Sequence, residues 1–343
     1  MQWTVENVPE LNGYVVEWAE PDNFYISRRN QLFHTTSLKP PFKKLAAATA
    51  PFWKTAASRI RLAQRLLRHA VTNVILLNNG DLFVAFDKTV GVLRDGKYRT
   101  LKNLVRPCRI LRSACGIDGG GNVYFGEYID NAARGTMRIY KYTPGADALE
   151  VVYTFSPKTI RHVHGIYFDV FTDSLFCLTG DVGAECCFWQ SFDGFNTIKI
   201  VGAGDETWRA VSVLFDETAF YYGTDAEHRT NHIFKVDRPT LERKSLGEVS
   251  GTVFHSIKMG ADLFFTTTAE NAPSQTENVA AVWHVDADDV LQNLIEFKKD
   301  RWHPSLFMFG KIHFPFVNRL ENELYLQVVG VKEDNQTFRL RRG

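Results

Sequence analysis

A weak internal repeat constrains the fold of this chain more than any other feature. Each copy reads as a strand, a turn, and a second strand that is rich in aromatic or β-branched residues and ends in a small residue and an acid. The spacing from one acid to the next is roughly 40 to 54 residues, the length of one four-stranded propeller blade. The five copies span residues 74–87, 114–128, 163–181, 211–225 and 254–270.

Further strands complete these units and extend the pattern to both ends of the chain. Third strands are expected at 136–143, 186–192, 231–237 and 280–286, and fourth strands at 149–155 and 197–203. Two more units span 14–48 and 306–340, and the strand 2–7 is expected to supply the outer strand of the last unit. The pattern therefore predicts an all-β chain, a β-propeller of seven four-stranded blades with six as the alternative. We expect residues 1–343 to form one domain, with the ring closed by the N-terminal strand joining the C-terminal blade.

One segment departs from the strand pattern and predicts a helix between the first two blades. Residues 55–71 read "TAASRIRLAQRLLRHAV", with apolar residues at helical spacing and arginines around the other side. The apolar positions are Ile60, Ala63, Leu67 and Ala70, and the arginines are Arg59, Arg61, Arg65 and Arg68. These arginines could bind a phosphate or a partner, but a solvated helix face is the preferred interpretation.

Charge and cysteine usage narrow the classes of function. The 40 Lys and Arg residues nearly balance the 39 Asp and Glu residues, so no broad positive field indicates nucleic acid or an anionic membrane as a partner. No window is apolar enough to insert into a membrane, and the N-terminus does not read as a signal peptide. The five cysteines show neither metal-knuckle spacing nor an even disulfide framework. We therefore expect a cytoplasmic protein with mostly buried thiols.

One turn has a recognisable pattern. Residues 191–198 read "SFDGFNTI" and match the Asp-box pattern at Ser191, Asp193 and Thr197, with Phe195 and Ile198 where glycine and tryptophan are usual. In such a turn the Asp and Ser or Thr side chains bond to backbone donors while an aromatic side chain packs against the blade. The match therefore bears on the fold rather than on chemistry.

Together with the repeat, this turn makes the chain resemble the sialidase-like, Asp-box (BNR-repeat) propellers. The stretches "FGEY", "RHVHGIYFD", "TGD", "WRAV", "YYGTD" and "KKDRW" are most similar to an uncharacterised group of such propellers associated with bacterial exopolysaccharide gene clusters. The resemblance covers about residues 56–329. It implies a propeller fold and a carbohydrate context, without an established reaction.

Propeller topology places two sets of polar residues at one face. The starts of inner strands and the ends of second strands meet at the face where propellers usually hold their ligands. Inner-strand starts carry Arg112, Arg161, His162, His164, Trp208, Arg209 and His255, and second strands end at Asp87, Glu127 with Tyr128, Asp181, Asp225 and Glu270. Each acid alone could be only a turn former, and each histidine only a core residue. Their common register nevertheless predicts a shared polar site.

Within this site we assign two groups of residues. The candidate catalytic residues are His162, His164, Glu127, Tyr128, Asp181 and Asp225. The candidate substrate-binding residues are Arg112, Arg161, Trp208, Arg209, His255 and Glu270. Carboxylates, imidazoles and a tyrosine supply the acids and bases of sugar chemistry, while arginines bind carboxylates and aromatic rings stack on sugars.

Two reactions and one non-catalytic function fit this set. Paired carboxylates indicate a glycoside hydrolase, whereas Arg161, His164 and Tyr128 could neutralise, deprotonate and protonate a uronate in a polysaccharide lyase. We expect an acidic bacterial polysaccharide or oligosaccharide as the ligand and no cofactor, with a divalent metal ion on the histidines and carboxylates as an open alternative. A propeller that only binds a glycan, or that scaffolds polysaccharide assembly, is the alternative from another class.

Overall fold

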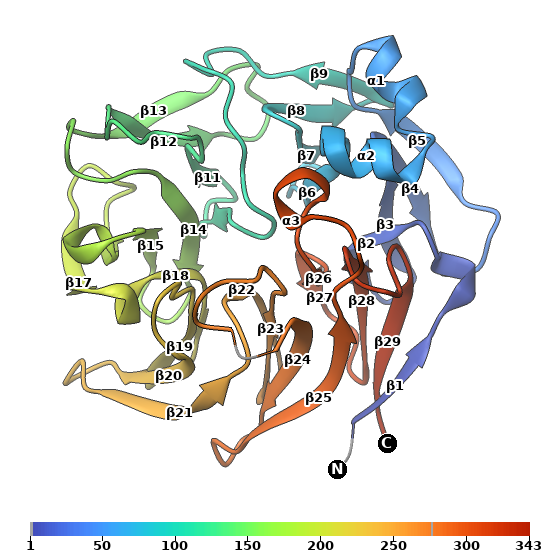
Figure 1. Ribbon diagram of the computed structural model, residues 1–343. Helices are drawn as coiled ribbons and strands as arrows, with labels where there is room; N and C mark the ends of the chain where they lie inside the picture. The colour runs from blue at the N-terminus through green and yellow to red at the C-terminus, as the bar shows by residue number, and fades with distance from the viewer. Residues whose placement is uncertain (1–2, 276) are drawn as a thin grey trace. The chain divides into compact units, whose positions relative to one another are not determined.

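A computed structural model describes residues 3–275 and 277–343 (Figure 1). The chain is a seven-bladed β-propeller with four-stranded blades, and its strands follow the repeat in sequence order. The seven-blade prediction is therefore confirmed. The contacts divide the chain into two compact units.

The first of these units comprises residues 101–256 and 272–275 of the described chain and contains three complete blades. Each blade is an antiparallel meander in which the first strand in sequence is followed in order by the other three. The blades are β10 (Gly116–Ile117), β11 (Val123–Gly126), β12 (Met137–Tyr142) and β13 (Glu150–Phe155); β14 (Val163–Asp169), β15 (Ser174–Thr179), β16 (Cys187–Ser191) and β17 (Lys199–Ala203); and β18 (Ala210–Phe215), β19 (Ala219–Thr224), β20 (Asn231–Asp237) and β21 (Arg243–Val249).

The other unit comprises residues 3–100, 257–271 and 277–343 of the described chain. It holds two further meanders, most of a third, and the blade that joins the two ends of the chain. The meanders are β2 (Val15–Glu20), β3 (Asn23–Arg28), β4 (Gln31–Thr35) and β5 (Lys43–Ala47); β6 (Val71–Leu76), β7 (Leu82–Phe86), β8 (Thr89–Arg94) and β9 (Lys97–Thr100); and β22 (Val253–Met259), β23 (Asp262–Thr267), β24 (Val279–Val285) and β25 (Leu291–Lys298). A short strand, β27 (Val317–Asn318), runs parallel to β2.

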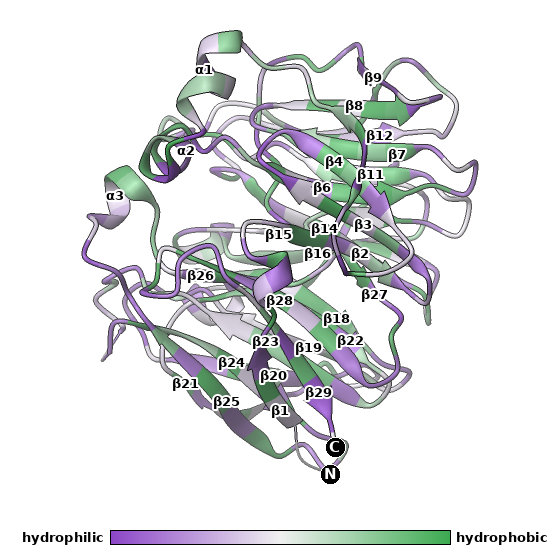
Figure 2. Cartoon of the chain, turned by 90° about the vertical axis from the view of Figure 1, so that its right-hand side faces the viewer, coloured by the Kyte–Doolittle hydropathy of each residue, from purple (hydrophilic) through white to green (hydrophobic). Residues whose placement is uncertain are grey.

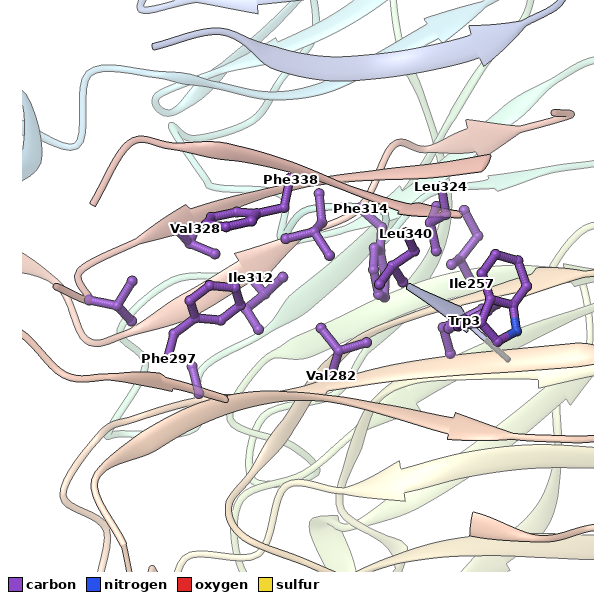
Figure 3. Packing of buried hydrophobic residues seen from close by; sticks show 14 of the residues in the cluster. Trp3, Ile257, Val282, Phe297, Ile312, Phe314, Leu324, Val328, Phe338 and Leu340 are labelled. Carbon is purple, nitrogen blue, oxygen red and sulfur yellow. The ribbon is translucent and has the colours of Figure 1, made fainter. Parts of the chain in front are cut away.

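The last blade takes its outer strand from the N-terminus. Its strands are β26 (Lys311–His313), β28 (Glu323–Val329), β29 (Thr337–Arg342) and β1 (Trp3–Asn7). Strand β1 pairs antiparallel with β29, from Trp3 opposite Arg342 to Asn7 opposite Phe338. Figure 3 shows the apolar side chains of this blade interdigitating with those of the β22–β25 blade, among them Trp3, Val282 and Phe338. Burying these side chains is the main force that holds the blades together.

The helical segment between the first two blades is present, but it forms two short helices instead of one. Helix α1 (Phe52–Ala57) ends at Ser58, and α2 (Arg61–Leu67) begins after Ile60, whose backbone is extended. Ile60 is 68% exposed, whereas Arg65 is only 2% exposed. The guanidinium of Arg65 points inward because it donates to Asp300 at 2.5 Å and to the carbonyl of Phe307 at 2.6 Å. The predicted apolar stripe is therefore wrong at these two positions.

These helices lie outside the strands of their unit, as does a third short helix, α3 (Pro304–Phe307) (Figure 2). Figure 2 also shows hydrophobic and hydrophilic residues mixed along the strands, as expected where alternate side chains enter the layers between blades. In the described part of the chain, no helix is both long and apolar enough to cross a bilayer.

The five cysteines, all within the described residues, are buried free thiols. Burial raises the pKa of Cys186 to about 11 and that of Cys187 to about 12. A thiol with a raised pKa is a poor nucleophile, because the thiolate is the reactive form. The adjacent pair therefore serves packing.

One close approach between blades positions the site. A Cβ atom on Gly126, at the end of β11, would lie 2.3 Å from a methyl carbon of Val163 at the start of β14. Only glycine therefore allows β11, the second strand of its blade, to approach the inner strand β14 so closely. The approach brings the segment after β11, which carries Tyr128, against the segment before β14, which carries His162.

Candidate functional site

Two histidines and an aspartate form a compact triangle in the unit of residues 101–256. The Nε2 atoms of His162 and His164 are 3.1 Å apart, and each is 3.4 Å from Oδ1 of Asp181. All three side chains are buried. We call these residues the His–His–Asp cluster. Across residues 3–275 and 277–343, it is the one group of three or more His, Cys, Asp or Glu side chains whose ligand atoms all lie within 4.8 Å of one another.

A β-bulge accounts for the position of His164. Val163 pairs with Thr179 and Gly165 with Leu178, so two residues on β14 advance the register by only one residue on β15. His164 is the extra residue. Such bulges re-aim a side chain and occur often beside functional sites. Sequence alternation placed both histidines on one face, but it could not show that their ring nitrogens would meet.

Backbone carbonyl groups fix the orientation of both imidazole rings. Nδ1 of His162 lies 3.2 Å from the carbonyl oxygen of Ile129, and Nδ1 of His164 lies 2.9 Å from that of Ala210. A carbonyl oxygen only accepts, so each Nδ1 carries the hydrogen and donates it. In the neutral rings both Nε2 atoms are then bare lone pairs that face each other and the Asp181 carboxylate.

Asp181 is held in place by its neighbours in sequence and in space. Gly180 precedes it with a φ of 153°, and a Cβ atom there would lie 3.0 Å from the Cα of Cys186. Nη1 of Arg161 donates to Oδ2 of Asp181 at 2.9 Å, which leaves Oδ1 directed at the histidines. Burial acts to raise the pKa of Asp181, but when the imidazoles carry an added proton at Nε2, their hydrogen bonds to Asp181 outweigh burial and hold that pKa far below its ordinary value.

Arg161 links the cluster to solvent and is fixed by two residues that the sequence did not single out. Its guanidinium also pairs with the exposed Asp130 at 3.2 Å. Its backbone N–H donates to Glu185, and its carbonyl accepts from Asn131. Asn131 lies in "NAARGT", a stretch without a recognisable motif. Only the loop's proximity to the end of β11 could have indicated it.

Arg209 and Asp225 extend the cluster toward the next blade. Nε of Arg209 donates to Oδ2 of Asp225 at 3.0 Å, and its Nη2 lies 3.6 Å from Oδ1 of Asp181. Although burial opposes it, the charges of Asp225 and Asp181 raise the pKa of Arg209 further above its already high value. The predicted group of Arg161, Asp181, Arg209 and Asp225 is thus brought together.

The neighbouring residues Glu127 and Tyr128 point to different surroundings. Glu127 is fully buried, accepts from Arg106 at 3.1 and 2.5 Å and from the hydroxyl of Tyr140 at 2.9 Å, and lies 3.5 Å from the guanidinium of Arg138. The ring of Tyr128 instead packs on His162, with ring centroids 4.3 Å apart. Glu127 therefore belongs to a buried ion-pair network, whereas Tyr128 borders the cluster. The two differ because adjacent residues project to opposite sides of the chain.

Trp208, predicted to stack on a sugar, packs its ring against other residues of the protein. Its ring stacks on Tyr222 at 5.6 Å, and the guanidinium of Arg243 lies 4.6 Å from its centroid. A Cβ atom on Gly202 would lie 2.3 Å from the indole. Trp208 therefore packs between its own blade and the preceding one, which contributes Gly202 on β17. The residues that cover it come from other strands, which local sequence could not indicate.

Three further residues that were predicted to bind substrate are not among the residues that contact the His–His–Asp cluster in the described structure. Arg112 is buried just before β10, and His255 is buried within β22. Glu270 belongs to the other compact unit, where it accepts from the Thr268 hydroxyl at 3.0 Å. Their role in ligand binding stays a prediction.

A polar cavity of about 330 Å³ lies at the opposite end of the β14–β15 hairpin from the cluster. Its lining includes Asp118, Asp173 and Asp193. Asp118 accepts from Asn122, and Asp193 accepts from the hydroxyl and amide of Thr197 in the turn singled out in the sequence. These two carboxylates are engaged in turn hydrogen bonds, so the His–His–Asp cluster is the better candidate site.

Comparisons with known proteins agree with the class of protein that the fold defines, a seven-bladed β-propeller. No family model matches the chain, and no curated protein matches it. A chain of the mitotic checkpoint complex is similar over 99% of this chain and 93% of that one, at 10% identity and a TM-score of 0.57.

Two other solved structures are larger proteins that share the fold. The extracellular domain of a hybrid two-component system from B. thetaiotaomicron is 12% identical, with a TM-score of 0.62 over 100% of this chain and 40% of that one. A prolyl endopeptidase is 11% identical, with a TM-score of 0.55 over 94% of this chain and 47% of that one. Identities this low indicate the fold alone.

Proposed function

We propose that this propeller binds an acidic polysaccharide or oligosaccharide at the His–His–Asp cluster and cleaves it by β-elimination. The observation that supports the proposal is the meeting of Arg161, Tyr128 and the cluster in one small region. Elimination requires a cation against the uronate carboxylate and groups that move a proton from C5 and to the leaving oxygen. The cluster region with Arg161 supplies the cation. Tyr128 acts as the proton-transfer group: its phenolate takes the C5 proton, the bond to the leaving oxygen breaks, and the hydroxyl so formed returns the proton to that oxygen.

The carboxylates argue against the alternative reaction, hydrolysis. A glycoside hydrolase of the usual kind needs one carboxylic acid that is protonated near neutral pH. Glu127 accepts hydrogen bonds from Arg106 and Tyr140. The pKa of Asp181 is held far below its ordinary value, and Asp225 is paired with Arg209. None of the three is suited to the role of general acid.

The test is a direct assay on uronate-containing polymers, namely polygalacturonate, alginate and a glucuronate polymer. Elimination raises both the reducing ends and the ultraviolet absorbance of an unsaturated sugar, whereas hydrolysis raises the reducing ends alone. We expect both signals on at least one polymer. Binding without either signal would make the protein a non-catalytic glycan-binding propeller and would overturn the enzymatic part of the proposal.

Tyr128→Phe tests the role of the hydroxyl while keeping the ring that packs on His162. Loss of a positioned proton-transfer group costs about 10²- to 10⁴-fold in rate, so we expect kcat to fall by at least about 100-fold. Tyr153→Phe, on β13 of the same blade, is the matched control and should retain activity. An unchanged kcat in Tyr128→Phe would remove this residue from the mechanism.

A further inference from the structure

The three atoms of the His–His–Asp cluster are arranged as a metal-binding triangle. A triangle with sides of 3.1, 3.4 and 3.4 Å has its centre about 1.9 Å from each corner, close to the 2.0–2.2 Å of zinc–nitrogen and zinc–oxygen bonds. An ion slightly out of the plane would meet all three atoms at bonding distance. Two imidazoles and one carboxylate on one side of the ion leave its other positions open.

The hydrogen bonds of the rings point to the same conclusion. Both Nδ1 atoms donate to backbone carbonyls, which is the arrangement that orients histidine ligands in metal sites. The two bare Nε2 atoms, 3.1 Å apart, cannot hydrogen-bond to each other without an added proton. A cation between them and Asp181 satisfies all three at once.

The carboxylate of Asp181, like the two imidazole rings, is oriented by a supporting hydrogen bond. Arg161 holds Oδ2 of Asp181 and leaves Oδ1 toward the imidazoles, so the aspartate is prepared as a one-oxygen ligand. A supporting contact of this kind fixes the geometry of a ligand before the ion binds.

The charges of the surroundings favour a cation as well. Linked ion pairs around the cluster contain five carboxylates and three guanidinium groups, which leaves two negative charges in excess before the histidines are counted. The carboxylates are Asp130, Asp181, Glu185, Asp225 and Glu227, and the guanidinium groups are Arg134, Arg161 and Arg209. Two of these carboxylates, Asp130 and Glu227, are 87% and 53% exposed and are screened by water, so the excess adds only modestly to the attraction for a cation.

We infer that His162, His164 and Asp181 bind one divalent first-row transition metal ion. Two imidazole ligands select such an ion over Mg²⁺ and Ca²⁺, which prefer oxygen ligands. The inference goes beyond the proposed carbohydrate function and stands on the geometry of the three residues. Under that function, the ion would supply the positive charge that meets the uronate carboxylate.

The test is calorimetric titration of the chelator-treated full chain with Zn²⁺, in the absence of any carbohydrate. We expect one high-affinity site for Zn²⁺ that Mg²⁺ and Ca²⁺ do not occupy. The absence of a Zn²⁺ site would overturn the inference. Because no sugar is present, this outcome is separate from the result of the polymer assay, and either proposal can fail alone.

Three ligand variants locate the ion. His162→Gln, His164→Gln and Asp181→Asn should each weaken Zn²⁺ binding by at least about 100-fold, since loss of a supporting residue alone costs 10–100-fold. His228→Gln is the matched control, because His228 is an exposed histidine of the same unit that pairs with Glu206. Unchanged binding in all three ligand variants would place the ion elsewhere and overturn the assignment.

A measurement on the unaltered protein tests the metal site even if the variants fail to fold. On addition of Zn²⁺, the ring resonances of two histidines should shift together and saturate at one equivalent, and Co²⁺ should give the visible absorption of a site with nitrogen ligands. Zinc-induced shifts confined to exposed histidines such as His228 would contradict the inference.

Discussion

At the scale of single residues, the site depends on positions where a side chain would not fit. Gly126 permits the contact between β11 and β14, and Gly180 turns the chain immediately before Asp181. Neither glycine has chemistry of its own. Both determine where the groups with chemistry lie, because they allow the backbone to approach or turn in ways that other residues resist.

Gly180→Ala should therefore weaken the metal site without touching a ligand. The added methyl group would press on Cys186 and displace Asp181 from the two imidazoles, and we expect Zn²⁺ affinity to fall by at least about tenfold, as for other supporting residues. Gly183→Ala is the matched control. Gly183 also has a positive φ, of 52°, but an added Cβ would meet nothing within 4 Å. Equal effects of the two changes on Zn²⁺ affinity would contradict this reasoning.

At the scale of elements, the sequence predicted the blades well and the inserted helices poorly. Alternating apolar residues and turn signals located β14 and β15, and the bonding of Phe195 and Thr197 to Ser191 and Asp193 follows the expected turn. Helix α2 differs from the prediction because Arg65 forms an ion pair with Asp300, about 235 residues later in the chain, and no local sequence pattern indicates that partner. The meeting of His164 and Asp181 could be predicted from register, whereas the bulge and the fixed ring orientations could not.

The contact between α2 and the segment before α3 gives a pH-dependent prediction. Burial acts to raise the pKa of Asp300, but hydrogen bonds from Arg65 and Lys299 outweigh it and lower that pKa. A lowered pKa in the folded state means that the carboxylate stabilises the fold above its ordinary pKa of about 3.9, and that this stability is lost as the pH falls.

Asp300→Asn should accordingly lower the free energy of unfolding by about 3 kcal/mol at neutral pH, because the buried Lys299 loses its carboxylate and Arg65 keeps only the more distant Asp334, 3.8 Å away. The difference from the unaltered protein should begin to shrink below about pH 4, where Asp300 of the unfolded chain becomes protonated, and should vanish only below the lowered pKa of the folded state. Urea unfolding at several pH values measures both effects. Asp95→Asn, in an exposed turn of the same unit, is the control. A loss in the free energy of unfolding of Asp300→Asn that does not change with pH would count against the ion pair.

At the scale of the whole molecule, stability depends on the pairing of the two chain ends. Trp3 on β1 is buried in the core of Figure 3 and meets the ring of Phe264 edge-on at 5.0 Å. Trp3→Ala should lower the free energy of unfolding by about 3–5 kcal/mol, as for other buried aromatic residues. Chemical denaturation measures the loss. Phe52→Ala, at an exposed helical position, should leave stability nearly unchanged, and equal effects would show that β1 adds little.

The pairing of β1 with β29 also sets an order of events during synthesis. Strand β1 cannot pair with β29 until residues 337–342 have been made, and at 5–20 residues per second the stretch from residue 3 to residue 342 takes about 20–70 s to synthesise. The contiguous stretch 101–256, which carries the His–His–Asp cluster, is complete well before then. The cluster can therefore assemble on the nascent chain while β1 is still unpaired. A chaperone that covers unpaired strand edges would be of most use at this stage.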